Sequence, residues 1–149
     1  VIHRGELLAG NFEFVKNEIK LMREAVPSKI LKVILETGEL KSAANIKKAS
    51  EIAIESGADF IKTSTGKGAT GADLQAVETM CIVISDHYKR TGKKIGIKPS
   101  GGIREIDDAI KYMDLVNKIL GDEWMNNKLF RIGASSLYSA IISDLANNK

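Results

Sequence analysis

Two lysines stand at the ends of short apolar runs, and a glycine-containing turn follows each of them. Lys62 lies in D-F-I-K-T-S-T-G-K (Asp59–Lys67), and Lys98 lies in I-G-I-K-P-S-G-G (Ile95–Gly102). A lysine amine attacks a carbonyl carbon only when it is neutral, and an unperturbed lysine is protonated at pH 7. A second ammonium group close by in a dry pocket lowers the pKa of the first. The pair therefore predicts Schiff-base chemistry, with one lysine as the nucleophile and the other as the group that lowers its pKa.

Around these lysines, short β-rich runs alternate with longer segments of helical periodicity, which is typical of βα units in a parallel sheet. No low-complexity linker divides the chain, so we expect residues 1–149 to form a single α/β domain. The expected strands are Ile30–Leu35, Asp59–Thr63, Lys94–Lys98 and Leu129–Gly133. The expected helices are Phe12–Ala25, Leu40–Ser56, Leu74–Tyr88, Ile106–Leu120 and Ser136–Ala146.

The spacing of the turns favours a TIM (β/α)8 barrel. The turns at Glu36, Lys62, Lys98 and Gly133 recur at roughly the ~30-residue period of one barrel unit. A flavodoxin-like sheet has a similar period, but strand alternation here points Lys32, Lys62 and Lys98 toward one interior. We therefore expect the C-terminal five-eighths of a barrel, roughly its last four strands with their helices and one preceding helix.

Two of the turns have the composition of a phosphate site. Gly101 and Gly102 follow the Lys98 strand, and Gly133-Ala134-Ser135-Ser136 follows the last strand and opens the final helix. Free backbone N–H groups and the helix dipole favour an anion at a helix N-terminus. Barrels commonly bind phosphate with the loops after their seventh and eighth strands, so these two turns predict the position of a phosphate group.

The composition excludes several other classes of function. A single cysteine and two isolated histidines in 149 residues predict neither a disulfide framework nor a metal site. The net charge of +3 is interleaved with acidic residues and only 5% of residues are aromatic, so we expect no nucleic-acid partner. Since no long apolar stretch or signal-peptide pattern appears, we expect a cytoplasmic protein without membrane contact. A small anionic ligand fits the positive net charge better than a nucleic acid does.

Four segments together resemble the deoxyribose-phosphate aldolase family over nearly the whole chain. They are L-K-V-I-L-E-T-G-E-L (Leu31–Leu40), A-D-F-I-K-T-S-T-G-K (Ala58–Lys67), G-I-K-P-S-G-G-I-R (Gly96–Arg104) and F-R-I-G-A-S-S-L (Phe130–Leu137). The resemblance implies that Lys62 forms the Schiff base and that Lys98 lowers its pKa. It also implies a site around the substrate phosphate made of Gly66, Lys67, Gly101, Gly102, Gly133, Ser135 and Ser136. We add Lys32, Thr63 and Thr65 as candidates that line the substrate pocket, and we expect a structural role for Glu36.

The resemblance implies a reaction that needs no cofactor. This is the reversible cleavage of 2-deoxy-D-ribose 5-phosphate to acetaldehyde and D-glyceraldehyde 3-phosphate, a step of deoxyribose phosphate and deoxyribonucleotide catabolism. In the family, the aspartate that relays protons lies in the strand just before the position that corresponds to Val1. Two alternatives therefore stay open: a phosphate-binding fragment without turnover, and another lysine-dependent barrel aldolase.

The expected part-barrel leaves two strands without a neighbour on one side. The segments Ile30–Leu35 and Leu129–Gly133 would each present an unpaired edge, and unpaired edges favour pairing with another chain. We therefore expect a homo-oligomer, or association with the missing half of the barrel.

Overall fold

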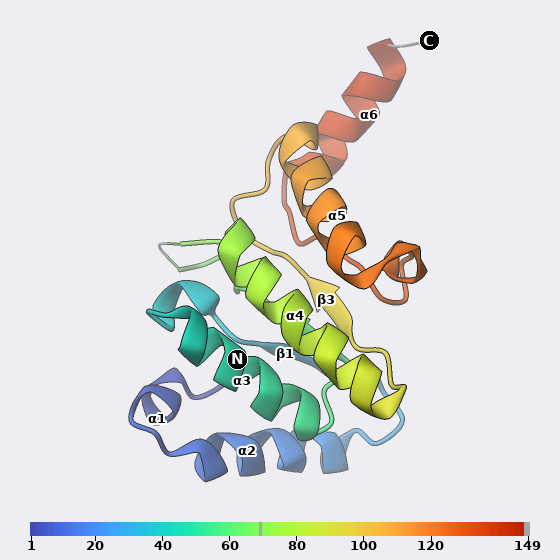
Figure 1. Ribbon diagram of the computed structural model, residues 1–149. Coiled ribbons are helices and arrows are strands. Elements are labelled where there is room, and N and C mark those ends of the chain that lie inside the picture. The colour runs from blue at the N-terminus through green and yellow to red at the C-terminus, as the bar shows by residue number, and fades with distance from the viewer. Residues whose placement is uncertain (69, 148–149) are drawn as a thin grey trace.

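The computed structural model describes residues 1–68 and 70–147. Within this part of the chain, helices alternate with the strands of a parallel sheet of order β1-β2-β3 (Figure 1). The strands are β1 (Lys32–Ile34), β2 (Phe60–Lys62) and β3 (Gly96–Lys98). The helices are α1 (Arg4–Leu8), α2 (Phe12–Ala25), α3 (Ala43–Glu55), α4 (Leu74–Thr91), α5 (Ile106–Leu120) and α6 (Leu137–Asn147), with 3-10 turns η1 (Thr37–Glu39) and η2 (Asp122–Trp124).

The sheet has one apolar face that the helices cover. Val33, Ile61 and Ile97 are paired across the three strands, and all three are buried in the core. Helices α3 and α4 pack against each other, as do α4 and α5, so the connections form one helical layer on this face (Figure 1). The opposite face carries the lysines. This arrangement is part of a (β/α) barrel, and the predicted fold class is confirmed.

The fourth predicted strand is present only as two isolated bridges, Ile97 with Phe130 and Ser100 with Gly133. The Ile97 N–H donates to the Leu129 carbonyl (2.8 Å) and the Gly133 N–H donates to the Pro99 carbonyl (2.8 Å), so the segment does run parallel to β3. Pro99 has no N–H, so the ladder lacks one donor between the two bridges. The prediction of a continuous strand over Leu129–Gly133 was therefore wrong in detail, although the pairing partner was right.

The helix starts follow from capping side chains. The Ser42 hydroxyl accepts from the Asn45 N–H (3.2 Å), and the Asp73 carboxylate accepts from the Ala76 N–H (2.8 Å). Each cap satisfies one of the free N–H groups of the first turn. Helix α3 thus begins at Ala43 rather than at Leu40, where the periodicity alone predicted its start.

The turn after α5 is fixed to the sheet by a tryptophan. Trp124 is buried, and its indole N–H donates to the Ile95 carbonyl directly before β3 (2.9 Å). Its ring also meets Tyr88 of α4 edge to face, with ring centroids 5.2 Å apart. The contact holds η2 against the strand that carries Lys98.

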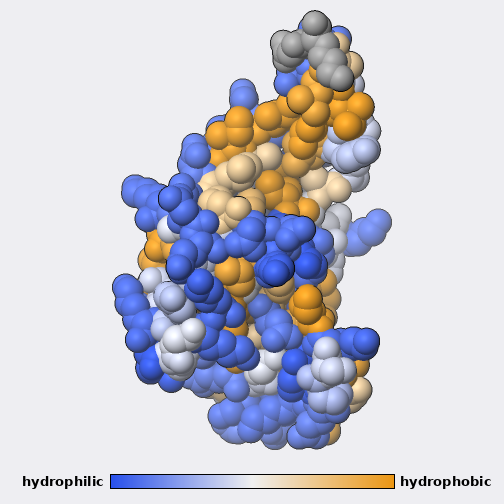
Figure 2. All heavy atoms as spheres, turned by 90° about the vertical axis from the view of Figure 1, so that its right-hand side faces the viewer, coloured by the Kyte–Doolittle hydropathy of each residue, from blue (hydrophilic) through white to orange (hydrophobic). Residues whose placement is uncertain are grey.

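Helix α6 leaves much of its apolar surface exposed. It packs on α5, but Tyr138, Ile142 and Leu145 remain 74%, 48% and 58% exposed. Figure 2 shows hydrophobic atoms gathered at the end of the molecule that includes α6. Across residues 1–68 and 70–147, no helix combines the length and the apolar character needed to cross a membrane.

Candidate active site

The strand register brings the two lysines of the sequence motifs side by side. Lys62 and Lys98 are the last residues of β2 and β3, and they are register partners in the parallel pair. Ile34 of β1 is the partner of Lys62 on its other side. Partners in a parallel ladder point to the same face, so both amines extend from the carboxyl ends of the strands on the face opposite the helices.

The surroundings of Lys62 favour its neutral form. Partial burial, followed by the positive charge of Lys98, lowers the pKa of Lys62, and the negative charge of Glu36 opposes this effect. The pKa of Lys32 is also lowered, first by burial and then by the charges of Lys98, Arg131 and Lys62. A lysine with a lowered pKa beside a second cation has the properties of an amine nucleophile.

Lys32 lies one layer away from this pair. It is the register partner of Phe60, and its Nζ lies 5.1 Å from the centroid of the Phe60 ring. The guanidinium carbon of Arg131 lies 5.0 Å from the same ring, so two cations contact one aromatic side chain. Lys32 lines a separate hollow of about 310 Å³ beside Val1 and Met22. Lys32 is close enough to Lys62 and Lys98 for their charges to lower its pKa, so its role at the substrate stays a prediction.

The predicted phosphate turns do meet around one hollow of about 380 Å³. Of the described residues that line it, none is acidic, and Lys67 and Arg104 are basic. The predicted residues on its wall are Thr65, Gly66, Lys67, Gly101, Gly102, Gly133 and Ser135. This composition of glycine backbone, hydroxyls and cations suits a phosphate group.

Two predicted lining residues are outside this wall. Ser136 is not among the lining residues, and its carbonyl accepts from the Ala140 N–H (3.1 Å) in the first turn of α6. Thr63 is fully buried: its hydroxyl donates to the Ser100 carbonyl (3.1 Å) and accepts from the Ser100 N–H (2.9 Å). Thr63 therefore ties the end of β2 to the loop after β3, and its prediction as a pocket residue was wrong.

The sequence interpretation missed Ser100 and Arg104, which also line the hollow. Both lie in the G-I-K-P-S-G-G-I-R segment that carried the family resemblance. The basic side chain two residues after Gly102 was the available signal.

Glycines allow the loops of this hollow to touch. The Cβ of any residue at Gly101, which has φ +90°, would lie 2.9 Å from the Gly71 Cα, and backbone cannot yield as a side chain can. A Cβ at Gly133 would collide with the Ser100 Oγ and lie 2.9 Å from the Lys98 Cε. The absence of a side chain at these two positions therefore sets the width of the hollow.

We expect Gly133→Ala to destabilise the protein by about 1–3 kcal/mol, because the added methyl overpacks the wall between Ser100 and Lys98. Urea denaturation followed by circular dichroism measures this loss. Gly5→Ala is the matched control, since a Cβ at Gly5 makes only ordinary contacts of 3.5 Å or more with His3. Equal stability of the Gly133→Ala variant and the wild type would show that the Ser100 and Lys98 side chains shift to accommodate the methyl group at no cost in stability.

The chain is similar to known aldolases. Residues 2–137 match the family model described as DeoC/LacD family aldolase. The human deoxyribose-phosphate aldolase is 48% identical over 141 residues, which cover 95% of this chain and 44% of the human protein. The chain thus spans about half the length of the curated relatives it matches.

Similar solved structures are also named as aldolases. A structure described as "QR15, an Aldolase" matches with a TM-score of 0.73 and 31% identity, covering all of this chain and 60% of its own. A deoxyribose phosphate aldolase from Aeropyrum pernix, described as a unique tetrameric structure, matches with a TM-score of 0.67 and 25% identity over 91% of this chain and 51% of its own. The chain belongs to the DeoC/LacD aldolase family.

Proposed function

We propose that the chain carries the Schiff-base centre of a class I aldolase, with Lys62 as the nucleophile and Lys98 as a nearby cation that helps burial to lower its pKa. The observation that carries this proposal is the register of the two lysines on adjacent strands, together with the lowered pKa of Lys62. The names of its aldolase relatives support the same reaction class. They also support 2-deoxy-D-ribose 5-phosphate as the substrate.

In the proposed cleavage, the neutral Lys62 amine adds to the aldehyde carbon of the open-chain sugar, and water leaves to give an iminium ion. A base removes the proton of the C3 hydroxyl, and the C2–C3 bond breaks as its electron pair moves into the iminium group. D-glyceraldehyde 3-phosphate leaves, and an enamine remains on Lys62. Protonation at C2 and hydrolysis then release acetaldehyde and restore the free amine.

We infer that the phosphate end of the substrate occupies the hollow of about 380 Å³ beside the lysines. Lys67 and Arg104 supply positive charge on its wall, and the glycine turns supply backbone N–H donors. Binding the phosphate there would fix the aldehyde end near Lys62, since the loops on the wall follow directly after β2 and β3.

Release of acetaldehyde from 2-deoxy-D-ribose 5-phosphate by the purified chain tests the proposed turnover. We expect release above the level of a Lys62→Met variant, which serves as the blank. Imine formation without acetaldehyde release would restrict the function to substrate binding and imine formation. Equal turnover of several other aldol substrates would instead favour another lysine-dependent aldolase.

We also infer that the chain associates with another polypeptide, most simply a second copy. The exposed apolar side chains of α6 support this, as does the tetrameric relative from Aeropyrum pernix. Light scattering coupled to size-exclusion chromatography should give a mass at least twice that of the 16.2 kDa chain. A double substitution, Ile142→Lys with Leu145→Lys, should reduce that mass if α6 forms the contact. A monodisperse monomer of the wild type would overturn the inference.

A further inference from the structure

Glu36 is a buried acid at the end of β1 with an unusual backbone conformation. Its φ and ψ are 56° and 58°, in the left-handed region that residues other than glycine seldom adopt, and the residue is only 3% exposed. Strained and buried charged residues persist where surrounding contacts hold them, and they gather at functional sites. The contacts of the Glu36 side chain therefore indicate which function its strained backbone serves.

The carboxylate of Glu36 contacts the backbone of the next loop. Its two oxygens accept from the Thr65 N–H at 3.1 and 3.2 Å. The Thr65 hydroxyl in turn accepts from the Lys67 N–H at 3.1 Å. Glu36 is thus the first member of a short hydrogen-bonded chain that ends at Lys67, on the wall of the proposed phosphate hollow.

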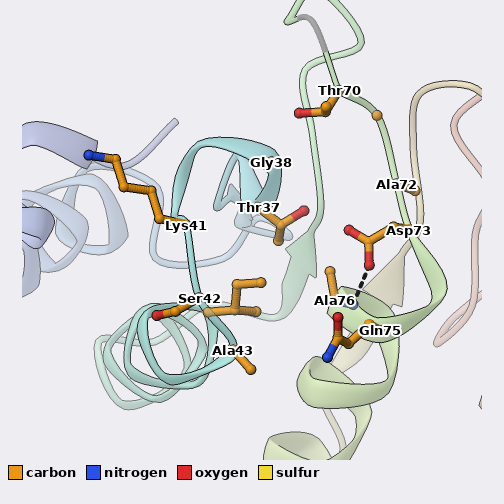
Figure 3. Close-up of a pocket in the computed structure, with 12 residues that line it drawn as sticks. Thr37, Gly38, Lys41, Ser42, Ala43, Thr70, Ala72, Asp73, Gln75 and Ala76 are labelled. Carbon is orange, nitrogen blue, oxygen red and sulfur yellow. Dashed lines mark hydrogen bonds between the residues drawn. The ribbon is translucent and has the colours of Figure 1, made fainter.

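The loops after β1 and β2 also meet on their outer side (Figure 3). The Thr37 N–H donates to the Thr63 carbonyl (2.9 Å). Gly38 lies so close to Thr70 that the Cβ of any other residue at this position would collide with the Thr70 hydroxyl. A second hollow, of about 420 Å³, lies between these loops, lined by Thr37, Thr70 and Asp73 among others. The contacts of Thr37 and Gly38 and the bond from the Thr65 N–H to Glu36 therefore join the two loops at separate points.

The charge of Glu36 works against the proposed chemistry at Lys62. A negative charge near an amine favours the protonated form, and Glu36 does raise the pKa of Lys62 relative to its other surroundings. Its benefit to the site must therefore come from its hydrogen bonds rather than from its charge.

We infer that Glu36 is a positioning residue for the substrate phosphate: its carboxylate holds the Thr65 N–H and so keeps Thr65, Gly66 and Lys67 in the shape that lines the hollow. This inference rests on the proposed phosphate site. It extends that site to the loop after β1, and it assigns the strained backbone at Glu36 to ligand binding.

Two conservative variants separate the effect of the length of the Glu36 side chain from the effect of its charge. Glu36→Asp keeps the charge and suits the left-handed backbone better, but its shorter side chain withdraws the carboxylate from the Thr65 N–H. Glu36→Gln keeps the length and one oxygen acceptor but removes the charge. Glu39→Gln is the matched control, because Glu39 is an exposed acid of the same loop whose partner is Arg4.

The test is the dissociation constant for inorganic phosphate, measured by NMR titration of the amide signals in the 149-residue chain. We expect Glu36→Asp to weaken phosphate binding by ~5-fold or more, the effect of one lost hydrogen bond, while Glu36→Gln and Glu39→Gln stay within about twofold of the wild type. Circular dichroism checks that each variant is folded. Unchanged binding in folded Glu36→Asp, or weakening in Glu36→Gln alone, overturns the inference, as does a wild type that binds no phosphate. Should Glu36→Asp fail to fold, Glu36→Asn takes its place, because it is equally short and also suits the left-handed backbone. The same ~5-fold weakening is expected of it, and unchanged binding in the folded Glu36→Asn variant overturns the inference.

This test and that of the proposed function fail separately. Borohydride trapping with unphosphorylated 2-deoxy-D-ribose depends on Lys62 and needs no phosphate hollow. A wild type that binds phosphate but forms no imine refutes the Schiff-base proposal, while the phosphate affinities of the variants still decide the role of Glu36.

Discussion

Replacing Lys62 with methionine should abolish the covalent adduct that borohydride traps between the protein and 2-deoxy-D-ribose 5-phosphate. Methionine reproduces the unbranched lysine side chain except for its terminal amine, so no imine can form at this position. We expect the trapping rate to fall by ~1000-fold or more, to the level of slow reaction at surface lysines. The measurement is intact-protein mass spectrometry after timed reduction, with equal substrate and reductant for wild type and variant.

Lys89→Met is the matched control for this substitution. Lys89 is an exposed lysine in the last turn of α4, away from the strand ends, so its loss should leave trapping unchanged. Near-wild-type trapping in a folded Lys62→Met variant would assign the nucleophile to another lysine.

Lys98→Met should slow imine formation at neutral pH by about tenfold or more without removing the nucleophile. The positive charge of Lys98 disfavours protonated Lys62, so its loss should raise the pKa of Lys62 and reduce the neutral fraction of the amine. The sign follows directly: the rate of imine formation rises with pH as Lys62 loses its proton, and the variant should need a higher pH to reach the same rate. Rates of borohydride trapping between about pH 6 and 10 give the two profiles.

The pH profile distinguishes this role from a structural one. At high pH, where Lys62 is neutral in both proteins, the variant should recover most of the wild-type rate. Lys94→Met is the control, since Lys94 precedes the same strand but pairs with Glu123 near the protein surface. A deficit that stays constant across the pH range would mean that Lys98 acts through geometry and not through its charge.

Much of the fold could be predicted from the sequence because the relevant signals are local. Apolar runs predicted the three regular strands, and helical periodicity predicted α2 and α4 close to their observed bounds. The pairing of Lys62 with Lys98 also followed, because each lysine ends a strand and parallel neighbours align their ends. Two details departed from the expectation for equally local reasons: Pro99 interrupts the last ladder, and Ser42 sets the start of α3. The expectation of one helix before the first strand was also wrong, because the short helix α1 precedes α2.

The finer arrangement of the site depends on contacts between distant segments, which periodicity does not encode. No local pattern indicates that Glu36 adopts a left-handed conformation and accepts from the Thr65 N–H. The placement of Lys32 over the Phe60 ring, with Arg131 at the same ring, involves two other segments of the chain. Similarly, Thr63 is an ordinary strand threonine by sequence, and its role appears only once Ser100 lies beside it.

The decisive measurement is the identity of the residue that forms the imine. The purified chain is incubated with 2-deoxy-D-ribose 5-phosphate and reduced with borohydride, and the adduct is located by peptide mass spectrometry, with circular dichroism to establish that the protein is folded. We predict a single reduced adduct on Lys62. A folded chain that carries no adduct, or one that carries it on Lys98 or Lys32 instead, would refute the assignment of Lys62 as the Schiff-base lysine.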